Sequence, residues 1–252
     1  MIDERPPLVT FLLRIADDNL VLAQRLGELI SWMPELEEDI AIANLSLDHL
    51  GQATAFLGYA AELTGTSDAD QLAMTRNERE FLNSVMVERP NGDFGQTMAR
   101  QFFVDAYQAP FYRALADSAD ERIAGVAAKA EKESRYHLEY SSSWLTRLGD
   151  GTEESHRRMQ AGIDQMWPFV DDLFATDDIE IQLRVDGIAP ELVDVRRSFD
   201  ETVTNVFASA RLSVPADPYQ RLGGRRGFHS EHLGPLLAEM QSLYRAMPGV
   251  SW

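Results

Sequence analysis

Carboxylate and imidazole side chains occur in this sequence at positions where an apolar helix face would otherwise be continuous. Asp105 interrupts one apolar stripe, while Glu133 and His137 lie one helical turn apart on another. Asn19 lies on a third stripe, and Asp48 lies beside a fourth. A buried carboxylate is costly unless it is paired, hydrogen-bonded or bound to a cation. These five positions therefore predict polar chemistry inside a helical bundle.

The metal site that such residues suggest is a carboxylate-bridged di-iron centre. Carboxylate oxygens and imidazole nitrogens both suit iron. Ferritin-like bundles supply one carboxylate from each of two helices and Glu-x-x-His from each of the other two. Residues three apart on a helix face the same side, so a single turn can offer two ligands.

The spacing of the histidines argues against a di-iron centre. Only His156 follows a glutamate, Glu153, by three residues, and this pair lies next to a glycine-containing turn, outside the longest helices. Asn19 stands where a carboxylate is expected, and no histidine follows Asp48 or Glu133 by three residues. We therefore predict no metal ligand and no catalytic residue in this chain.

The expected alternative is a metal-free bundle in which Asn19, Asp48, Asp105, Glu133 and His137 are degenerate metal-type positions. Its acids would be held by salt bridges to basic residues such as Arg14, Arg100, Lys129 and Lys132. A di-iron oxidase with atypical ligands is the competing hypothesis.

A second group of candidate residues lies in the loop from Gly223 to Pro235. His229, Glu231 and His232 lie within four residues and suit a metal ion, which gives a third hypothesis, a metal-dependent enzyme. A plainer interpretation is that Ser230 is the N-cap of a C-terminal helix and that the glycines shape the loop before it.

Three arginines near this loop form a basic group in a very acidic chain, and guanidinium groups bind phosphate or carboxylate well. They also suit pairing with local acids. The residues that we consider candidates for contact with a partner or an anion are Arg221, Arg225, Arg226, His229 and His232.

The overall charge excludes several classes of partner. The chain has 252 residues, with 41 acidic and 23 basic side chains, a net charge of −18 and a pI near 4.6. Such a field repels nucleic acid and anionic lipid surfaces, so neither is an expected partner. The absence of cysteine excludes disulfides and thiolate chemistry and fits the cytoplasm.

Apolar residues recur every three or four positions through most of the chain, which predicts an all-α protein. Long helices joined by short links favour antiparallel neighbours, so we expect one domain over residues 1–252, a four-helix bundle with additional flanking helices. Pro110 should kink the fourth helix. The expected helices span approximately residues 7–30, 34–64, 70–81, 94–112, 123–148, 159–173, 192–210 and 230–247.

The second of these helices is apolar on more than one face, which indicates a central position. We expect its main stripe to face the core: Leu36, Ile40, Ala43, Leu47, Leu50, Leu57 and Ala61. A second set occupies flanking positions: Ile42, Leu45, Ala53, Phe56, Ala60 and Leu63.

Several strings of residues resemble one family over nearly the whole length. They lie at residues 18–22, 24–28, 47–53, 88–94 and 133–138, and the most specific is Glu-His-Leu-Gly-Pro-Leu-Leu-Ala-Glu-Met-Gln at 231–241. On these strings the chain resembles the C-subunit family of bacterial ring-1,2-phenylacetyl-CoA epoxidases, multicomponent monooxygenases of phenylacetate degradation.

The resemblance implies a ferritin-like fold and a structural role. In this family a homologous A subunit holds the di-iron centre and binds the CoA thioester, and the C subunit has lost the metal and supports its partner. The assembly inserts one atom of O₂ across the 1,2 bond of the ring, with electrons from NADPH through a separate reductase subunit. The implied partners are the A subunit and the other epoxidase subunits, with a homodimer when the chain is isolated. No cofactor is expected in this chain.

Overall fold

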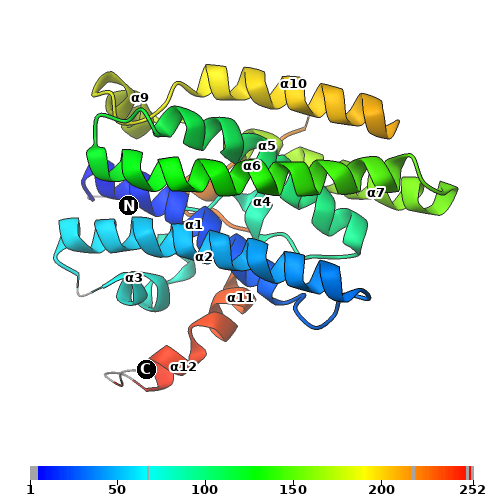
Figure 1. Cartoon of the computed structure of the whole chain (residues 1–252). Helices are drawn as coiled ribbons and strands as arrows, with labels where there is room; N and C mark the ends of the chain where they lie inside the picture. The colour runs from blue at the N-terminus through cyan, green and yellow to red at the C-terminus, as the bar shows by residue number, and fades with distance from the viewer. Residues whose placement is uncertain (1–4, 67, 217–218, 248–249, 251–252) are drawn as a thin grey trace. The chain divides into compact units, whose positions relative to one another are not determined.

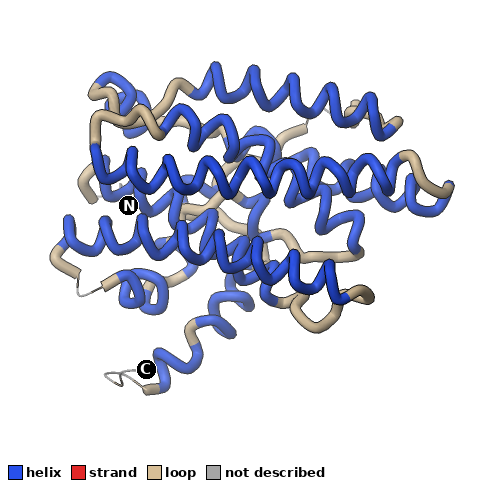
Figure 2. Tube along the Cα trace, in the orientation of Figure 1, coloured by secondary structure: helices blue, strands red, loops and turns tan. Residues whose placement is uncertain are grey.

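The regular structure of the chain is helical, as the periodicity of its apolar residues indicates. The computed structural model describes residues 5–66, 68–216, 219–247 and 250, and within these ranges every regular element is a helix (Figure 2). The prediction of an all-α fold is confirmed. Within the same ranges, none of the helices combines the length and the apolarity that crossing a bilayer requires.

The chain divides into two compact units. The first contains the residues up to Arg89 together with those from Gly223 onward, and the second contains Pro90–Leu222. Each unit contains one pair of long helices, which are the two pairs that the bundle prediction requires. The prediction of one domain over residues 1–252 stays a prediction.

The first unit is built on α1 and α2, which pack side by side (Figure 1). The turn between them is held because the backbone N–H of Ser31 donates to Asp39 Oδ1 at 2.6 Å. The second long helix ends at Gly65, whose left-handed backbone (φ 68°) closes it as predicted. The α-helices are α1 Pro7–Gly27, α2 Leu36–Thr64, α3 Ala69–Thr75, α4 Val85–Glu88, α11 Leu233–Met240 and α12 Ser242–Ala246, with 3₁₀ turns at Glu78–Glu80 and Gly224–Arg226.

The second unit is built on α5 and α6, with α7 and α10 packed against α5. Asp93 and Asp120 begin the two long helices by accepting backbone N–H groups of the first turn. The helix α5 continues through Pro110 to Leu115. The elements are α5 Phe94–Leu115, α6 Glu121–Gly149, α7 Glu153–Met166, α8 Val170–Leu173, α9 Asp178–Val185 and α10 Leu192–Ala210, with a 3₁₀ turn at Trp167–Phe169.

The predicted core face of α2 is wrong. Most of the expected main stripe lies at the surface, with exposed fractions of 70% for Leu36 and 63% for Leu47. The flanking set is buried instead, apart from the exposed Leu63. Periodicity alone could not separate two apolar faces, and the face that packs carries the small residues Ala53 and Ala60, which allow close approach of a neighbouring helix.

The C-terminal helix also differs from its prediction. It begins at Leu233, and α11 is followed by a separate short helix, α12. Ser230 is not its N-cap, because His232 occupies that position. Ser230 lies in the preceding loop, where its backbone N–H donates to the buried carboxylate of Glu88. The short helices α4 and α9 were not predicted, because elements of four and eight residues give little periodic signal in the sequence.

The end of α2 offers a test of backbone control. We expect Gly65→Ala to lower the free energy of unfolding by about 1 kcal/mol, because a Cβ at a left-handed position is strained although the space around it is open. Gly58→Ala, inside the same helix and equally unobstructed, should raise it by about 0.8 kcal/mol. Urea unfolding of both variants measures the difference, and effects of the same sign would contradict this account.

Candidate functional site

The metal-type position on α1 is an amide that is already engaged. Asn19 is fully buried, its Nδ2 donates to the carbonyl of Ile15 at 2.8 Å, and its Oδ1 lies 2.8 Å from His49 Nδ1. The imidazole of His49 therefore donates to Asn19. His49 was not among the predicted site residues, although it lies four residues after Leu45 and three before Gln52 on the face of α2 that packs.

The metal-type position on α5 is a buried carboxylate with two hydrogen bonds. Asp105 Oδ1 accepts from Gln101 Nε2 at 2.7 Å, and Oδ2 accepts from Ser141 Oγ on α6 at 2.7 Å. Burial raises the pKa of Asp105 to about 6, against the charge of His137 and the two hydrogen bonds, which lower it. The effect of desolvation on the pKa of Asp105 is therefore larger than the combined effect of its polar neighbours.

Of the two residues placed on the inward face of α6, His137 is buried, whereas at Glu133 the next residue, Ser134, is buried instead. Ser134 and Ser141 are buried in line with the fully buried His137, where small hydroxyl side chains fit against α5. Glu133 lies at the edge of this face, and its carboxylate pairs with Lys129 at 3.2 Å, one of the predicted salt-bridge partners. Asp48 on α2 is likewise only partly buried.

The donor set at the five metal-type positions does not fit a di-iron centre. Only Asp105 combines a carboxylate with full burial, and both of its oxygens already accept hydrogen bonds. Asn19 offers an amide in a carboxylate's place, and Glu133 is held by a lysine. Ferritin-like sites use four carboxylates with two imidazoles. These positions of the described chain therefore lack the charge that balances two iron ions.

The first unit holds its buried acids in a network of charged pairs. Asp18 on α1 accepts from Arg225 Nη2 at 2.7 Å, and Asp17 accepts from Arg76 Nη1 at 2.9 Å. Arg225 also donates to the carbonyl of Arg14, and Arg14 donates to the carbonyl of Arg225. All of these side chains are buried, so the charges of Asp17 and Asp18 are compensated where they are desolvated.

A third charged pair joins α4 to the C-terminal loop. His229 Nδ1 lies 2.8 Å from Glu88 Oε2, and its Nε2 lies 2.8 Å from the carbonyl of Phe81. Both neighbours are acceptors, so both ring nitrogens donate and the ring is an imidazolium. Burial alone would lower the pKa of His229, but the hydrogen bond and the charge of Glu88 raise it by more. The pKa of His229 therefore lies above its usual value. Asn83 Nδ2 also donates to Glu88, at 3.0 Å.

The five predicted contact residues fall into two groups. Arg225 and His229 are occupied inside the first unit, as described above. Arg226 is exposed beside Phe228, whose ring centre lies 5.8 Å from its guanidinium, and His232 lies 3.4 Å from the exposed carboxylate of Glu231. Arg221 belongs to the second unit and is exposed. Contact with a partner or an anion stays a prediction for all five.

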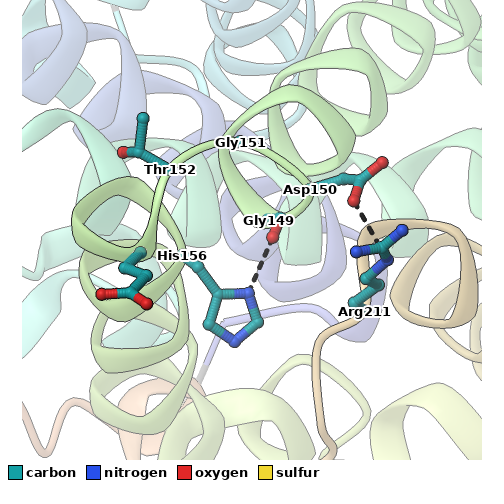
Figure 3. Close-up of a pocket in the computed structure, with 7 residues that line it drawn as sticks. Gly149, Asp150, Gly151, Thr152, His156 and Arg211 are labelled. Carbon is teal, nitrogen blue, oxygen red and sulfur yellow. Dashed lines mark hydrogen bonds and ion pairs between the residues drawn. The ribbon is translucent and has the colours of Figure 1, made fainter.

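A shallow pocket of about 260 Å³ lies where α6 ends and α7 begins (Figure 3). The imidazole of His156 points to the carbonyl of Gly149, with its Nδ1 at 2.7 Å, and Arg211 Nε pairs with Asp150 at 3.0 Å. Glu153 also lines it, so the single Glu-x-x-His pair of the sequence lies on a surface turn. This pocket is not a bundle interior of the kind that holds a di-iron centre.

Comparisons with known proteins agree with the resemblance found in the sequence. A family model described as phenylacetic acid catabolic protein matches residues 1–252. The chain is 49% identical over 245 residues to the C subunit of the 1,2-phenylacetyl-CoA epoxidase of Escherichia coli (strain K12), covering 97% of this chain and 99% of that protein. Among solved structures, protein 19 with aldehyde deformylating oxidase activity from Synechococcus is 18% identical, with a TM-score of 0.49 over 82% of this chain and 88% of that one.

The buried carboxylate of α5 predicts a pH-dependent penalty. Because the pKa of Asp105 is raised in the folded state, the folded protein binds more protons than the unfolded one between pH 4 and 6. As pH rises from 4 to 6, the free energy of unfolding of the wild type relative to Asp105→Asn should therefore fall by about 3 kcal/mol in total. Above pH 6 this difference should stay level. The asparagine can still accept from Gln101 and donate to Ser141 Oγ.

Urea unfolding between pH 4 and 8 measures this difference, with the exposed Asp117→Asn as the control. A difference between the wild type and Asp105→Asn that does not change with pH would show that the carboxylate of Asp105 is not desolvated as described.

The imidazolium in the C-terminal loop predicts a second pH dependence. His229→Gln leaves the buried carboxylate of Glu88 without its cation and should cost about 3 kcal/mol at pH 6. The pKa of His229 is higher in the folded than in the unfolded protein. The extra stability of the wild type over His229→Gln is therefore fully present below the pKa of the unfolded state, and it is lost as pH rises through the pKa of the folded state. The matched control, His232→Gln, changes a partly exposed histidine and should cost under about 0.5 kcal/mol. Equal losses in the two variants would refute the buried pair.

Proposed function

The chain belongs to the phenylacetic acid catabolic protein family, and on this premise we propose that it is a non-catalytic structural subunit of a 1,2-phenylacetyl-CoA epoxidase. In this proposal it supports a homologous catalytic A subunit that holds the di-iron centre. Identity to the C subunit of such an epoxidase, over nearly the full length of both chains, supports membership of a multi-subunit enzyme.

The observation that carries the structural role is the donor chemistry of the metal-type positions. Asn19 is neutral and bonded to His49, Glu133 is paired with Lys129, and Asp105 has both oxygens occupied by protein donors. Each of these three positions thus has a protein partner of its own. A bundle with internally paired polar groups is stable without an ion, which is what a supporting subunit needs.

The division of labour follows from what a di-iron site demands. When bound in the A subunit, the two irons would activate O₂ with electrons that a separate reductase takes from NADPH. Such a centre needs ligands held within fractions of an ångström by the surrounding shell of side chains. The present chain would contribute rigidity, because the Asp18–Arg225 and Glu88–His229 pairs fix α1, α4 and the C-terminal loop of the first unit together.

The hypothesis of a metal-dependent enzyme at the C-terminal loop has little structural support. Both ring nitrogens of His229 already donate to Glu88 and to a backbone carbonyl, so neither is available as a ligand. A partly exposed His232 beside the carboxylate of Glu231 is an ordinary surface arrangement. Three further properties stay predictions. They are a location in the cytoplasm, a homodimer when the chain is isolated, and association with the remaining epoxidase subunits.

Iron content tests the proposal directly. The purified chain should contain well under one iron atom per polypeptide by elemental analysis, also after incubation with ferrous iron and desalting. The expected reason is the missing negative charge at the metal-type positions. Iron at two atoms per chain, with the absorption band of a carboxylate-bridged pair, would overturn the structural role and establish the di-iron oxidase with atypical ligands.

Activity of the reconstituted assembly provides the control. Asp105→Asn and Glu133→Gln in this chain should leave turnover of phenylacetyl-CoA within about twofold of wild type, once the amount of folded complex is equalised. A loss of about 100-fold or more without loss of complex would identify these acids as catalytic and would contradict the proposal.

A further inference from the structure

The face of α2 opposite its packed face carries large aliphatic side chains in water. We name this set the outer stripe: Leu36, Ile40, Leu47 and Leu50, with exposed fractions of 70, 51, 63 and 38%. At about 100° per residue the four lie within an arc of about 80°. The buried residues Leu45 and Gln52 lie on the other side of the helix. The outer stripe is thus continuous and separate from the core.

The turn before α2 carries two more exposed apolar side chains, close in sequence to the first residue of the outer stripe. Trp32 is 81% exposed and Ile30 is 41% exposed. The turn is fixed, since Ser31 donates to Asp39 and the backbone N–H of Trp32 donates to the carbonyl of Leu29 at 2.9 Å. A large aromatic side chain on a fixed turn is the usual anchor of a protein interface. Single exposed aliphatics need no explanation, but a row of four beside a tryptophan does.

The charged residues closest in sequence to the outer stripe are all acidic. From residue 26 to residue 75 the sequence contains nine acidic residues and no lysine or arginine. Glu35 and Glu37 are exposed at the start of α2, close in sequence to Leu36. An apolar row in an acidic surrounding complements an apolar face with a basic rim. The same charges oppose a second copy of this chain, because acidic rims would meet each other.

We propose that the outer stripe of α2, with Trp32, is the surface that docks a helical face of the catalytic A subunit, and that this face has a lysine- and arginine-rich rim. The inference rests on the proposed function for the existence of that partner and adds the place of contact and its chemistry. Specific interfaces bury about 800 Å² on each side around an apolar centre. The outer stripe supplies the apolar centre, and the acids around it supply the polar rim.

The test replaces two stripe residues and measures association. Leu36→Gln/Leu47→Gln keeps helix propensity but removes the apolar centre. We expect the dissociation constant of the full-length chain with the purified A subunit to rise at least tenfold, measured by titration calorimetry. Glu37→Lys should also weaken binding, more at low salt than at high salt, since it removes a charge facing the basic rim.

The matched control uses two aliphatic residues that are equally exposed in the second unit. Val185→Gln/Val193→Gln alters side chains that are 73% and 71% exposed, and should leave the affinity within twofold of wild type. The unfolding midpoint of the isolated stripe variant should also equal that of wild type. A lower midpoint would mean that this chain covers its own stripe and would overturn the proposal.

The remaining outcomes separate this inference from the proposed function. If wild type and the stripe variant bind the A subunit equally, the docking surface is wrong and the structural role survives. If wild type does not bind the A subunit, the proposed function fails and this inference fails with it. If the variant loses only self-association in sedimentation experiments, a second copy is the occupant and the inference is overturned. Affinity of Glu37→Lys that is insensitive to salt would refute the basic rim.

Discussion

The first unit depends on keeping the negative charges inside it compensated. Asp17, Asp18 and Glu88 are all buried, and each is paired with a cation that is distant in sequence. Removing one partner of such a pair leaves a bare charge in a poorly solvating interior, which costs several kcal/mol. The cations are supplied by the C-cap of α3, Arg76, and by the C-terminal loop, so the positions of these segments are dictated by the acids on α1 and α4.

The second unit holds its buried Asp105 through hydrogen bonds from neutral side chains. Asp105 is stabilised by hydrogen bonds from an amide and a hydroxyl, which leave its pKa raised. A carboxylate of this kind costs stability at neutral pH, whereas the ion pairs of the first unit do not leave a charge unmatched. The polar interior of this protein is therefore tolerated through protein donors, and that is the physical basis for proposing a support role over an oxidase.

How far the sequence determines the fold can be judged from α2. Its length and its end at Gly65 follow from local chemistry, and both were predictable. Its orientation about its own axis was not, since two apolar faces satisfy the same periodicity and only packing against α1 selects the one with Ala53 and Ala60. His49 was overlooked for the same reason. Arg225 and His229 were candidates because each lies in a local cluster, of arginines and of possible metal ligands, but their partners on α1 and α4 lie more than a hundred positions away, beyond any local pattern.

The discontinuity of the first unit has a consequence for biosynthesis. Residues 90–222 emerge from the ribosome after Asp18 and Glu88 but before Arg225 and His229. The second unit is therefore complete in sequence while the first still lacks two of its counter-ions, and the N-terminal segment of the nascent chain stays incompletely paired until Arg225 and His229 have been synthesised. A stop codon or frameshift shortly before Gly223 would leave Asp18 on α1 and Glu88 on α4 without their cations, and we expect such a truncated polypeptide to be degraded rather than assembled.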